Sequence, residues 1–239
     1  DDRALFMARP LEEFLVRRLD DDPRWDRIAT AFITATGAPA DHGETAIVMS
    51  QMGETADIAA EVSRIFLGIQ VQCAQCHDHF TDRWKRPQFH EFAAFFPRIA
   101  IRRRPGEGVE RFEVESYDVG PRRDRRKMVN DPRRGDLEHE MPDLADPSRP
   151  GTVMTPRFFL TGGTLPQGTT DQERRGAIAR WITAGDQPWF DRALVNRLWA
   201  ELVGGGFYRG VDDIGPDRDP EPIAAGGTTL DDLAAGFRK

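Results

Sequence analysis

The chain has two cysteines, Cys73 and Cys76, and His77 follows the second one directly. On one helical turn, positions i, i+3 and i+4 face the same side, so both thiols and the imidazole are expected to point the same way. The pattern Cys-x-x-Cys-His is typical of covalent haem attachment, in which the thiols bond to the porphyrin and the histidine binds the iron. We therefore predict haem c bound at Cys73, Cys76 and His77.

Other interpretations of the same residues stay open. A zinc or non-haem iron ion held by Cys73, Cys76, His77 and His79 would suit a metal-dependent enzyme, because thiolates and imidazoles form tetrahedral ligand sets. A disulfide between the two cysteines would instead suit a structural or interaction module. A thioredoxin-like redox couple is disfavoured because the expected strand–helix context is absent. The motif alone does not decide whether the chain is an enzyme.

The second iron ligand is not specified by the motif. His79 is too close to His77 to reach the opposite haem face easily. We therefore expect it to support the site without binding the iron, and keep it as an alternative metal ligand. His90, on a phenylalanine-rich helix, is a weak metal-ligand candidate, since a lone histidine on an apolar helix is more often structural. The other possible ligands are His42, His139, Met49, Met52, Met128, Met141 and Met154.

Composition limits the class of protein. With 39% hydrophobic and 31% charged residues among 239, the chain is of the soluble globular type. Its net charge of -7 argues against general nucleic-acid binding. No apolar stretch approaches the ~20 residues of a membrane helix, so we expect no transmembrane segment. The chain starts at Asp1, and we expect it to be a piece of a longer protein.

Apolar spacing predicts a mainly α fold. We expect two helices over 10–36, the second starting at Asp22-Pro23 and ending at Gly37, then a loop over 38–54. A helix follows from Thr55 to Gly68, and another runs from near Pro87 to Pro97. Alternating residues over 99–114, with a turn at 105–108, predict a small β-hairpin.

The remaining residues predict a long irregular connection followed by helices. Residues 118–168 show little periodicity. Thr170 and Glu173 form a capping box, and the helix after them is expected to end at Gly185. A further helix is expected from Pro188 to Gly204, with inward residues Phe190, Ala193, Leu194, Leu198 and Leu202. One more helix is expected to start at Thr229.

We divide the chain into a cytochrome-c-like domain at 1–120, an irregular connection at 121–168, and a truncated second helical domain at 169–239. Residues 67–79, Asp82-Arg83-Trp84 and 92–96 resemble a planctomycete cytochrome-c-like domain of unknown function. Residues 189–200 with Val211-Asp212-Asp213 resemble the start of the domain that usually follows it. The sequence departs from the first pattern at Phe80-Thr81, where a Pro-Phe pair is expected.

The resemblance implies an exported, multidomain protein, and hence a periplasmic or otherwise extracytoplasmic location. It also implies an upstream cytochrome domain or a separate redox partner protein. With the motif, it favours an electron-transfer or redox module. The aromatic residues nearby would either form a low-dielectric wall that raises the reduction potential or pack as an ordinary core. They are Trp84, Phe89, Phe92, Phe95 and Phe96.

Overall fold

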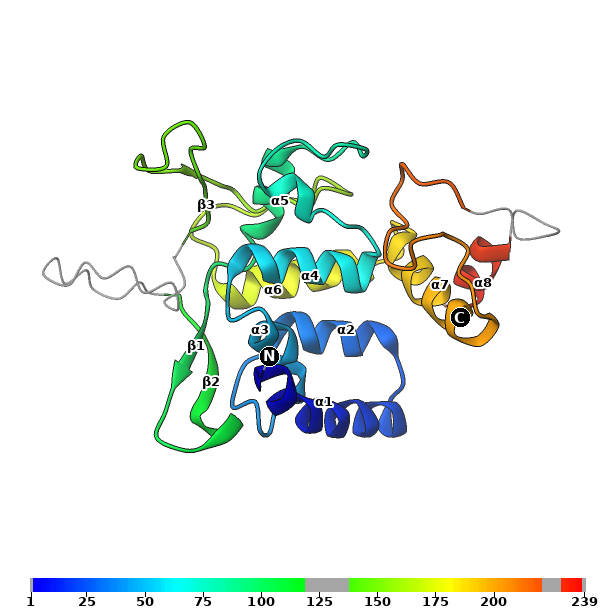
Figure 1. Ribbon diagram of the computed structural model, residues 1–239, viewed down its shortest axis with the longest axis horizontal. Coiled ribbons are helices and arrows are strands. Elements are labelled where there is room, and N and C mark those ends of the chain that lie inside the picture. The colour runs from blue at the N-terminus through cyan, green and yellow to red at the C-terminus, as the bar shows by residue number, and fades with distance from the viewer. Residues whose placement is uncertain (1, 119–137, 221–228, 238–239) are drawn as a thin grey trace, which may run out of the picture.

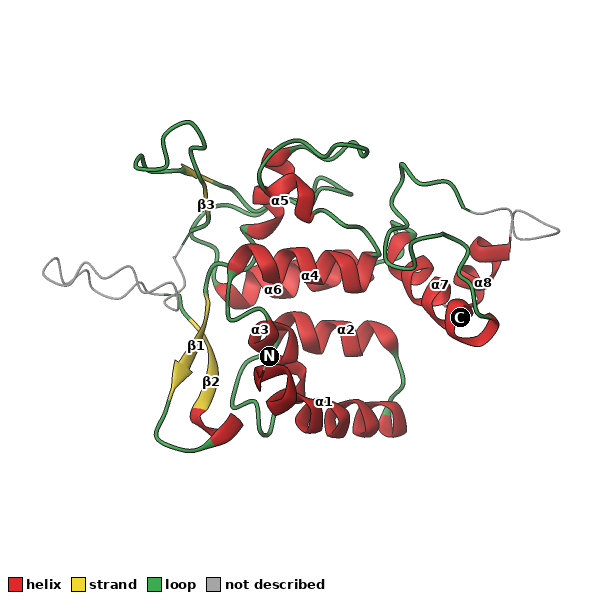
Figure 2. Cartoon of the chain, in the orientation of Figure 1, coloured by secondary structure: helices red, strands yellow, loops and turns green. Residues whose placement is uncertain are grey.

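The computed structural model describes residues 2–118, 138–220 and 229–237 (Figure 1). Helices dominate this part of the chain, and its strands form two small antiparallel pairs (Figure 2), which confirms the predicted mainly α class. The α-helices are α1 (Asp2–Asp21), α2 (Trp25–Thr34), α3 (Ala46–Ser50), α4 (Thr55–Leu67), α5 (Arg86–Ala93), α6 (Asp171–Thr183), α7 (Trp189–Val203) and α8 (Thr229–Phe237). The 3-10 turns are η1 (Gly43–Thr45), η2 (Gln72–Gln75) and η3 (Gly108–Arg111). The strands are β1 (Ile99–Arg103), β2 (Phe112–Ser116), β3 (Glu140–Met141) and β4 (Thr152–Val153).

One large hydrophobic core joins the first helices to α6. Helix α2 packs against α6, and α4 packs against α5 and α7. Phe66 of α4, Phe92 of α5 and Ile178 of α6 are all fully buried in this core. The boundary predicted at residue 169 stays a prediction, but α6 shares its apolar face with the helices that precede the irregular connection.

Three predicted boundaries near the N-terminus are wrong. Helix α1 starts at Asp2 and continues through Pro10, rather than starting there. Helix α2 begins at Trp25 instead of at Asp22-Pro23, and it ends at Thr34. Gly37 does not end the helix; it has a positive φ of 106° and forms an isolated antiparallel bridge with Val114 of the hairpin.

The loop predicted over 38–54 contains a helix. Residues 43–45 form η1 and residues 46–50 form α3. Ala46, Ile47, Val48 and Met49 are all buried in the main core. A short apolar run is ambiguous between loop, strand and helix from its pattern alone, and here burial against α1 and α4 decides for the helix.

The predicted β-hairpin is confirmed. Strands β1 and β2 pair antiparallel, with Ile101 opposite Val114. The region predicted as irregular holds a second short pair, β3 with β4, in which Glu140 lies opposite Val153. Residues 119–137 of that region lie outside the described residues.

Two buried arginines at the start of α6 attach it to the earlier helices. Arg175, 2% exposed, pairs with the buried Asp171 at 2.5 Å and donates to the carbonyls of Ile33 and Ala35 at the end of α2. Arg174 is fully buried and donates to the carbonyl of Ala94 at the end of α5.

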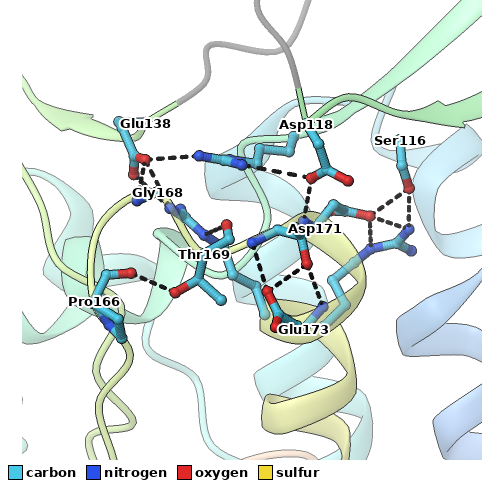
Figure 3. A network of polar contacts seen from close by, with 12 residues as sticks. Ser116, Asp118, Glu138, Pro166, Gly168, Thr169, Asp171 and Glu173 are labelled. Carbon is cyan, nitrogen blue, oxygen red and sulfur yellow. Dashed lines mark hydrogen bonds and ion pairs between the residues drawn. The ribbon is translucent and has the colours of Figure 1, made fainter.

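A carboxylate of the connecting region completes this network. Both oxygens of Glu138 accept from Arg174, at 2.8 and 2.7 Å, and one accepts from Arg98 at 2.9 Å (Figure 3). Buried charges are tolerated only when paired, so these contacts specify where α6 sits. The predicted capping box of Thr170 and Glu173 is confirmed directly before them.

Part of the predicted inward face of α7 is wrong. Phe190 and Ala193 are buried as expected, but Leu198 is 47% exposed and Leu202 is 84% exposed. The buried face includes Asn196, which is fully buried and whose side chain bonds the backbone of the following loop. This helix and α8 form a second, smaller core with that loop. Among the described residues no helix is long and apolar enough to cross a membrane.

Candidate functional site

The Cys-x-x-Cys-His run follows directly on the end of α4. Gly68 ends that helix in the left-handed conformation, with φ 65°. Ile69 and Val71 are then buried, at 1% and 2% exposed. Cys73 lies in η2, which ends at Gln75; Cys76 caps this 3-10 turn, and His77 lies in the bend that follows it. These buried neighbours fix the turn on the surface of the main core.

The burial pattern separates the two sides of this turn. Ala74 is fully buried, whereas Cys73, Cys76 and His77 are all exposed. Both cysteines are free thiols. All three predicted attachment residues are therefore accessible to solvent, and their joint role stays a prediction.

The ring of His77 is oriented by its neighbour. Its Nδ1 lies 2.8 Å from the carbonyl oxygen of Asp78. A carbonyl only accepts, so Nδ1 carries a proton, and in the neutral ring Nε2 keeps its lone pair. Metal-binding histidines usually donate their other ring N–H in this way. His77 therefore presents the tautomer that an iron ligand needs.

The side chain of Asp78 is held by the start of α5. Its carboxylate accepts from the Arg86 N–H at 3.0 Å and pairs with the Lys85 ammonium at 3.1 Å. The Arg86 bond, followed by the Lys85 bond, holds the pKa of Asp78 below its usual value. Asp78 is therefore ionised and anchored at neutral pH.

An exposed aromatic ring lies beside His77. The ring centroids of Phe80 and His77 are 4.1 Å apart, and Phe80 is 84% exposed. Leaving a phenylalanine in water forgoes roughly 1.5–3 kcal/mol of burial free energy. An exposed apolar ring next to an imidazole suits a surface that a planar apolar group covers.

His79 organises the loop after the motif. Its Nδ1 accepts the backbone N–H groups of Asp82, at 3.0 Å, and Thr81, at 3.3 Å. The backbone N–H of His79 donates to the carbonyl of Trp84 at 2.8 Å. Because Nδ1 is used as an acceptor, the ring supports the loop.

His90 has both ring nitrogens in use. Its Nε2 donates to the carbonyl of Gln75, at 2.9 Å, inside the motif. Its Nδ1 then accepts from Nε2 of His139, at 2.8 Å. Burial lowers the pKa of His90, and burial next to His90 lowers that of His139 to about 4. Both rings are neutral at pH 7, and His90 is a structural residue while these bonds persist.

The aromatic residues near the motif form core rather than an open wall. All five have exposed fractions of 4% or less. Trp84 differs in one respect, because its buried indole N–H has no acceptor among the described residues. Of the other possible ligands, Met49 and Met154 are buried, Met52 is 44% exposed, and Met128 lies outside the described residues.

The residues of the run include the chemical groups that covalent haem attachment needs. Two free exposed thiols and a correctly oriented imidazole are the chemical groups that c-type attachment uses. Across the ranges that the structure describes, no group of three or more His, Cys, Asp or Glu residues is arranged to hold a metal ion. His79, the fourth zinc ligand considered, uses Nδ1 to accept a backbone N–H.

Two residues that contact the motif's loop were missed by the sequence analysis. Asp217 and Arg218, in the segment after α7, bind Arg83 and Asp82. No local signal marks them, because the contact spans more than 130 positions of sequence. The one available hint is that Asp-Arg occurs at both places, in the opposite-charge arrangement that allows mutual pairing.

Comparison with known proteins gives two family matches. Residues 3–100 match the family PSCyt2, described as "Protein of unknown function (DUF1549)". Residues 174–239 match PSD1, described as "Protein of unknown function (DUF1553)". The chain is thus similar to two domains of unknown function, in that order, and the first match includes the whole Cys-x-x-Cys-His run. No curated protein and no solved structure matches the chain.

Proposed function

We propose that this chain is a c-type haem-binding redox or electron-transfer module of an exported multidomain protein. The observation that carries the proposal is the bond from His77 Nδ1 to the Asp78 carbonyl, at 2.8 Å. It leaves Nε2 as the electron-pair donor, on an exposed side chain, one residue from an exposed free thiol and four from another. These groups support the proposal, because thioether attachment uses two thiols and iron ligation uses an imidazole lone pair.

The residues have distinct roles in this proposal. Cys73 and Cys76 would hold the haem, because each thiol would add its sulfur and its hydrogen across one porphyrin vinyl group with nothing released. His77 would hold the iron through its Nε2 lone pair, while the Asp78 carbonyl keeps the ring oriented. Phe80 supplies an apolar surface beside that ring. When bound, haem supplies one-electron iron chemistry.

The exposure of the site bears on its reduction potential. The five aromatic residues considered for a low-dielectric wall are buried in the core. The attachment residues themselves are exposed. Water stabilises the more highly charged oxidised centre, so we expect a lower potential than a sealed pocket would give. An accessible haem edge also suits electron exchange with a redox partner protein or an upstream cytochrome domain.

The setting follows from the proposed chemistry. Covalent haem attachment at such a motif takes place outside the cytoplasm, so the proposal includes a periplasmic or otherwise extracytoplasmic location. The chain's similarity to two domains in tandem is consistent with a multidomain protein. Zinc or non-haem iron, and a disulfide between the cysteines, are the competing outcomes of the test.

The test is expression in a bacterial periplasm with haem c maturation machinery, followed by a denaturing gel stained for haem peroxidase activity. We expect the wild-type band to keep its stain after denaturation. The double variant Cys73→Ala/Cys76→Ala is expected to lose it, because no thioether can form. His42→Gln, which changes an exposed histidine outside the motif, is the matched control and is expected to keep the stain.

Metal analysis and thiol titration on the same preparation complete the test. A chain without haem that holds one zinc or iron ion, lost in the cysteine double variant, would overturn the proposal in favour of a metal site. A chain without haem, metal or titratable thiols would overturn it in favour of a disulfide-stabilised module.

A further inference from the structure

The loop that follows the attachment run is hydrogen-bonded to Asp217 and Arg218, which lie in the segment after α7. The Asp217 carboxylate accepts the backbone N–H of Arg83 at 2.8 Å. It also accepts from the Arg83 guanidinium at 2.8 and 3.0 Å. Arg218 in turn bonds the Asp82 carboxylate and donates to the Thr81 hydroxyl at 3.2 Å. Two neighbouring residues on each side therefore pair with opposite charges, and we call these four residues the clasp.

Burial shows which ion pair of the clasp is more costly to break. The Asp82 side chain is 2% exposed, whereas Arg218 is 25% exposed and Arg83 is 60% exposed. A buried carboxylate without a partner is costly, so Asp82 depends on Arg218. Asp82 also donates its backbone N–H to His79 Nδ1. The clasp thus acts on the residue that His79 uses to shape the loop.

The same segment also contacts the other side of the attachment run. The Ile214 N–H donates to the carbonyl of Gly68 at 2.8 Å. A Cβ at Gly68 would lie 2.6 Å from the Ile214 side chain, so the two chains are in close contact there. Residues 214–218 therefore touch the chain on both sides of Cys73, Cys76 and His77.

We infer that Asp217 and Arg218 are positioning residues of the candidate haem site, an inference that rests on the proposed function. They hold the loop over 79–84, and with it Phe80, in its place beside His77. Neither residue touches the attachment groups in the structure, so their effect passes through Arg83 and Asp82. The segment after α7 thereby sets the position of the loop beside His77.

The inference gives the second matched region a role in the first. The motif and its loop lie within 3–100, and the clasp residues Asp217 and Arg218 lie within 174–239. Any movement of the second region, on binding a partner or in a longer protein, would shift the loop beside His77. The structure therefore links two regions that are separate matches in sequence.

The test compares Asp217→Ala and Asp217→Asn with wild type, all loaded with haem. Asp231→Ala is the matched control, because it removes a carboxylate that pairs with Arg192 in the same part of the chain, away from the loop. Hydrogen exchange at the Arg83 amide is measured first, since that N–H donates directly to Asp217. Loss of a charge-assisted hydrogen bond is expected to cut its protection about tenfold or more in Asp217→Ala.

The second readout is the haem itself. We expect the dissociation constant of added imidazole to differ about tenfold between Asp217→Ala and wild type. We also expect the reduction potential of the variant to shift, with the haem stain retained. Asp217→Asn is expected to fall between them, because its amide oxygen still accepts the Arg83 N–H. Neither readout should move in Asp231→Ala.

The outcomes separate this inference from the proposed function. A wild-type chain that never acquires haem overturns the proposed function, and the positioning role falls with it. Normal attachment in every variant, with wild-type imidazole binding and potential in Asp217→Ala, overturns the positioning role alone. Asp217 is on the surface of the fold, and unchanged far-ultraviolet circular dichroism shows that each variant folds.

Discussion

Three histidines near the candidate site differ in which ring nitrogen the protein occupies. His77 donates from Nδ1 and keeps the Nε2 lone pair. His79 accepts at Nδ1 from two backbone amides. His90 uses both nitrogens, one toward Gln75 and one toward His139. The same residue type therefore serves as a candidate ligand, a loop support and a core residue, and the hydrogen bonds decide which.

The His90–His139 pair predicts a pH dependence of stability. Burial lowers the pKa of His139 from 6.5 to about 4, and lowers that of His90. Between these values the unfolded chain binds a proton that the folded chain does not, so the free energy of unfolding falls as pH drops from 6.5 toward 4. The loss due to His139 is at most about 3 kcal/mol.

Urea unfolding at several pH values measures this effect. His139→Gln keeps a donor for His90 but does not titrate, so its stability should fall less steeply over the same range. His90→Gln should also flatten the dependence, because it removes the other buried ring. An unchanged slope in both variants would contradict the assignment.

At the scale of the element, the end of α4 shows a constraint that the helix pattern does not contain. Gly68 was predicted to end the helix, and its φ of 65° confirms this. The tertiary structure adds a second reason for glycine, because a Cβ there would lie 2.6 Å from Ile214. Gly204 ends α7 in a similar conformation, with φ 87°, but its Cβ would meet nothing within 4 Å.

These two glycines make a matched pair of substitutions. Gly204→Ala should destabilise the protein by about 1 kcal/mol, the cost of a left-handed non-glycine residue. Gly68→Ala should cost about 1–3 kcal/mol more, because the methyl group overpacks against the buried Ile214. Both are measured as changes in the free energy of urea unfolding, and equal losses would show that the contact with Ile214 yields freely.

At the scale of the whole molecule, the division of the chain is a question of which helices share a core. The sequence suggested a new domain at 169, after the irregular connection. In the structure, Ile178 and Ile182 of α6 are fully buried in the same core as Phe66 of α4. Arg174 and Arg175 bind backbone carbonyls after α5 and at the end of α2.

Truncation tests this organisation. We expect residues 1–168 to lose cooperative unfolding, because deleting α6 removes several buried apolar residues, each worth about 2–5 kcal/mol against a typical total of 5–15 kcal/mol. Residues 1–187, which keep α6 but lose α7, should unfold cooperatively at lower stability. Thermal unfolding by circular dichroism distinguishes the two. Cooperative folding of residues 1–168 would support the boundary at 169.

Much of the fold follows from local patterns. The helices from Thr55 and after Thr170, and the hairpin over 99–114, were predicted because spacing, capping residues and turn residues act over a few positions. Errors occurred where local signals were weak, as at the apolar run 46–49, or where distant contacts took over. Leu198 and Leu202 fit a helical stripe, yet α7 instead buries Asn196, which bonds a loop.

The sequence by itself determined the helical class and the hairpin, because apolar spacing, capping residues and turn residues act over a few positions. Only the tertiary structure decided the orientation of His77, the exposure of Phe80 and the clasp of Asp217 and Arg218 on the motif's loop. Those features depend on hydrogen bonds, burial and charge pairs that form only when distant parts of the chain have packed together.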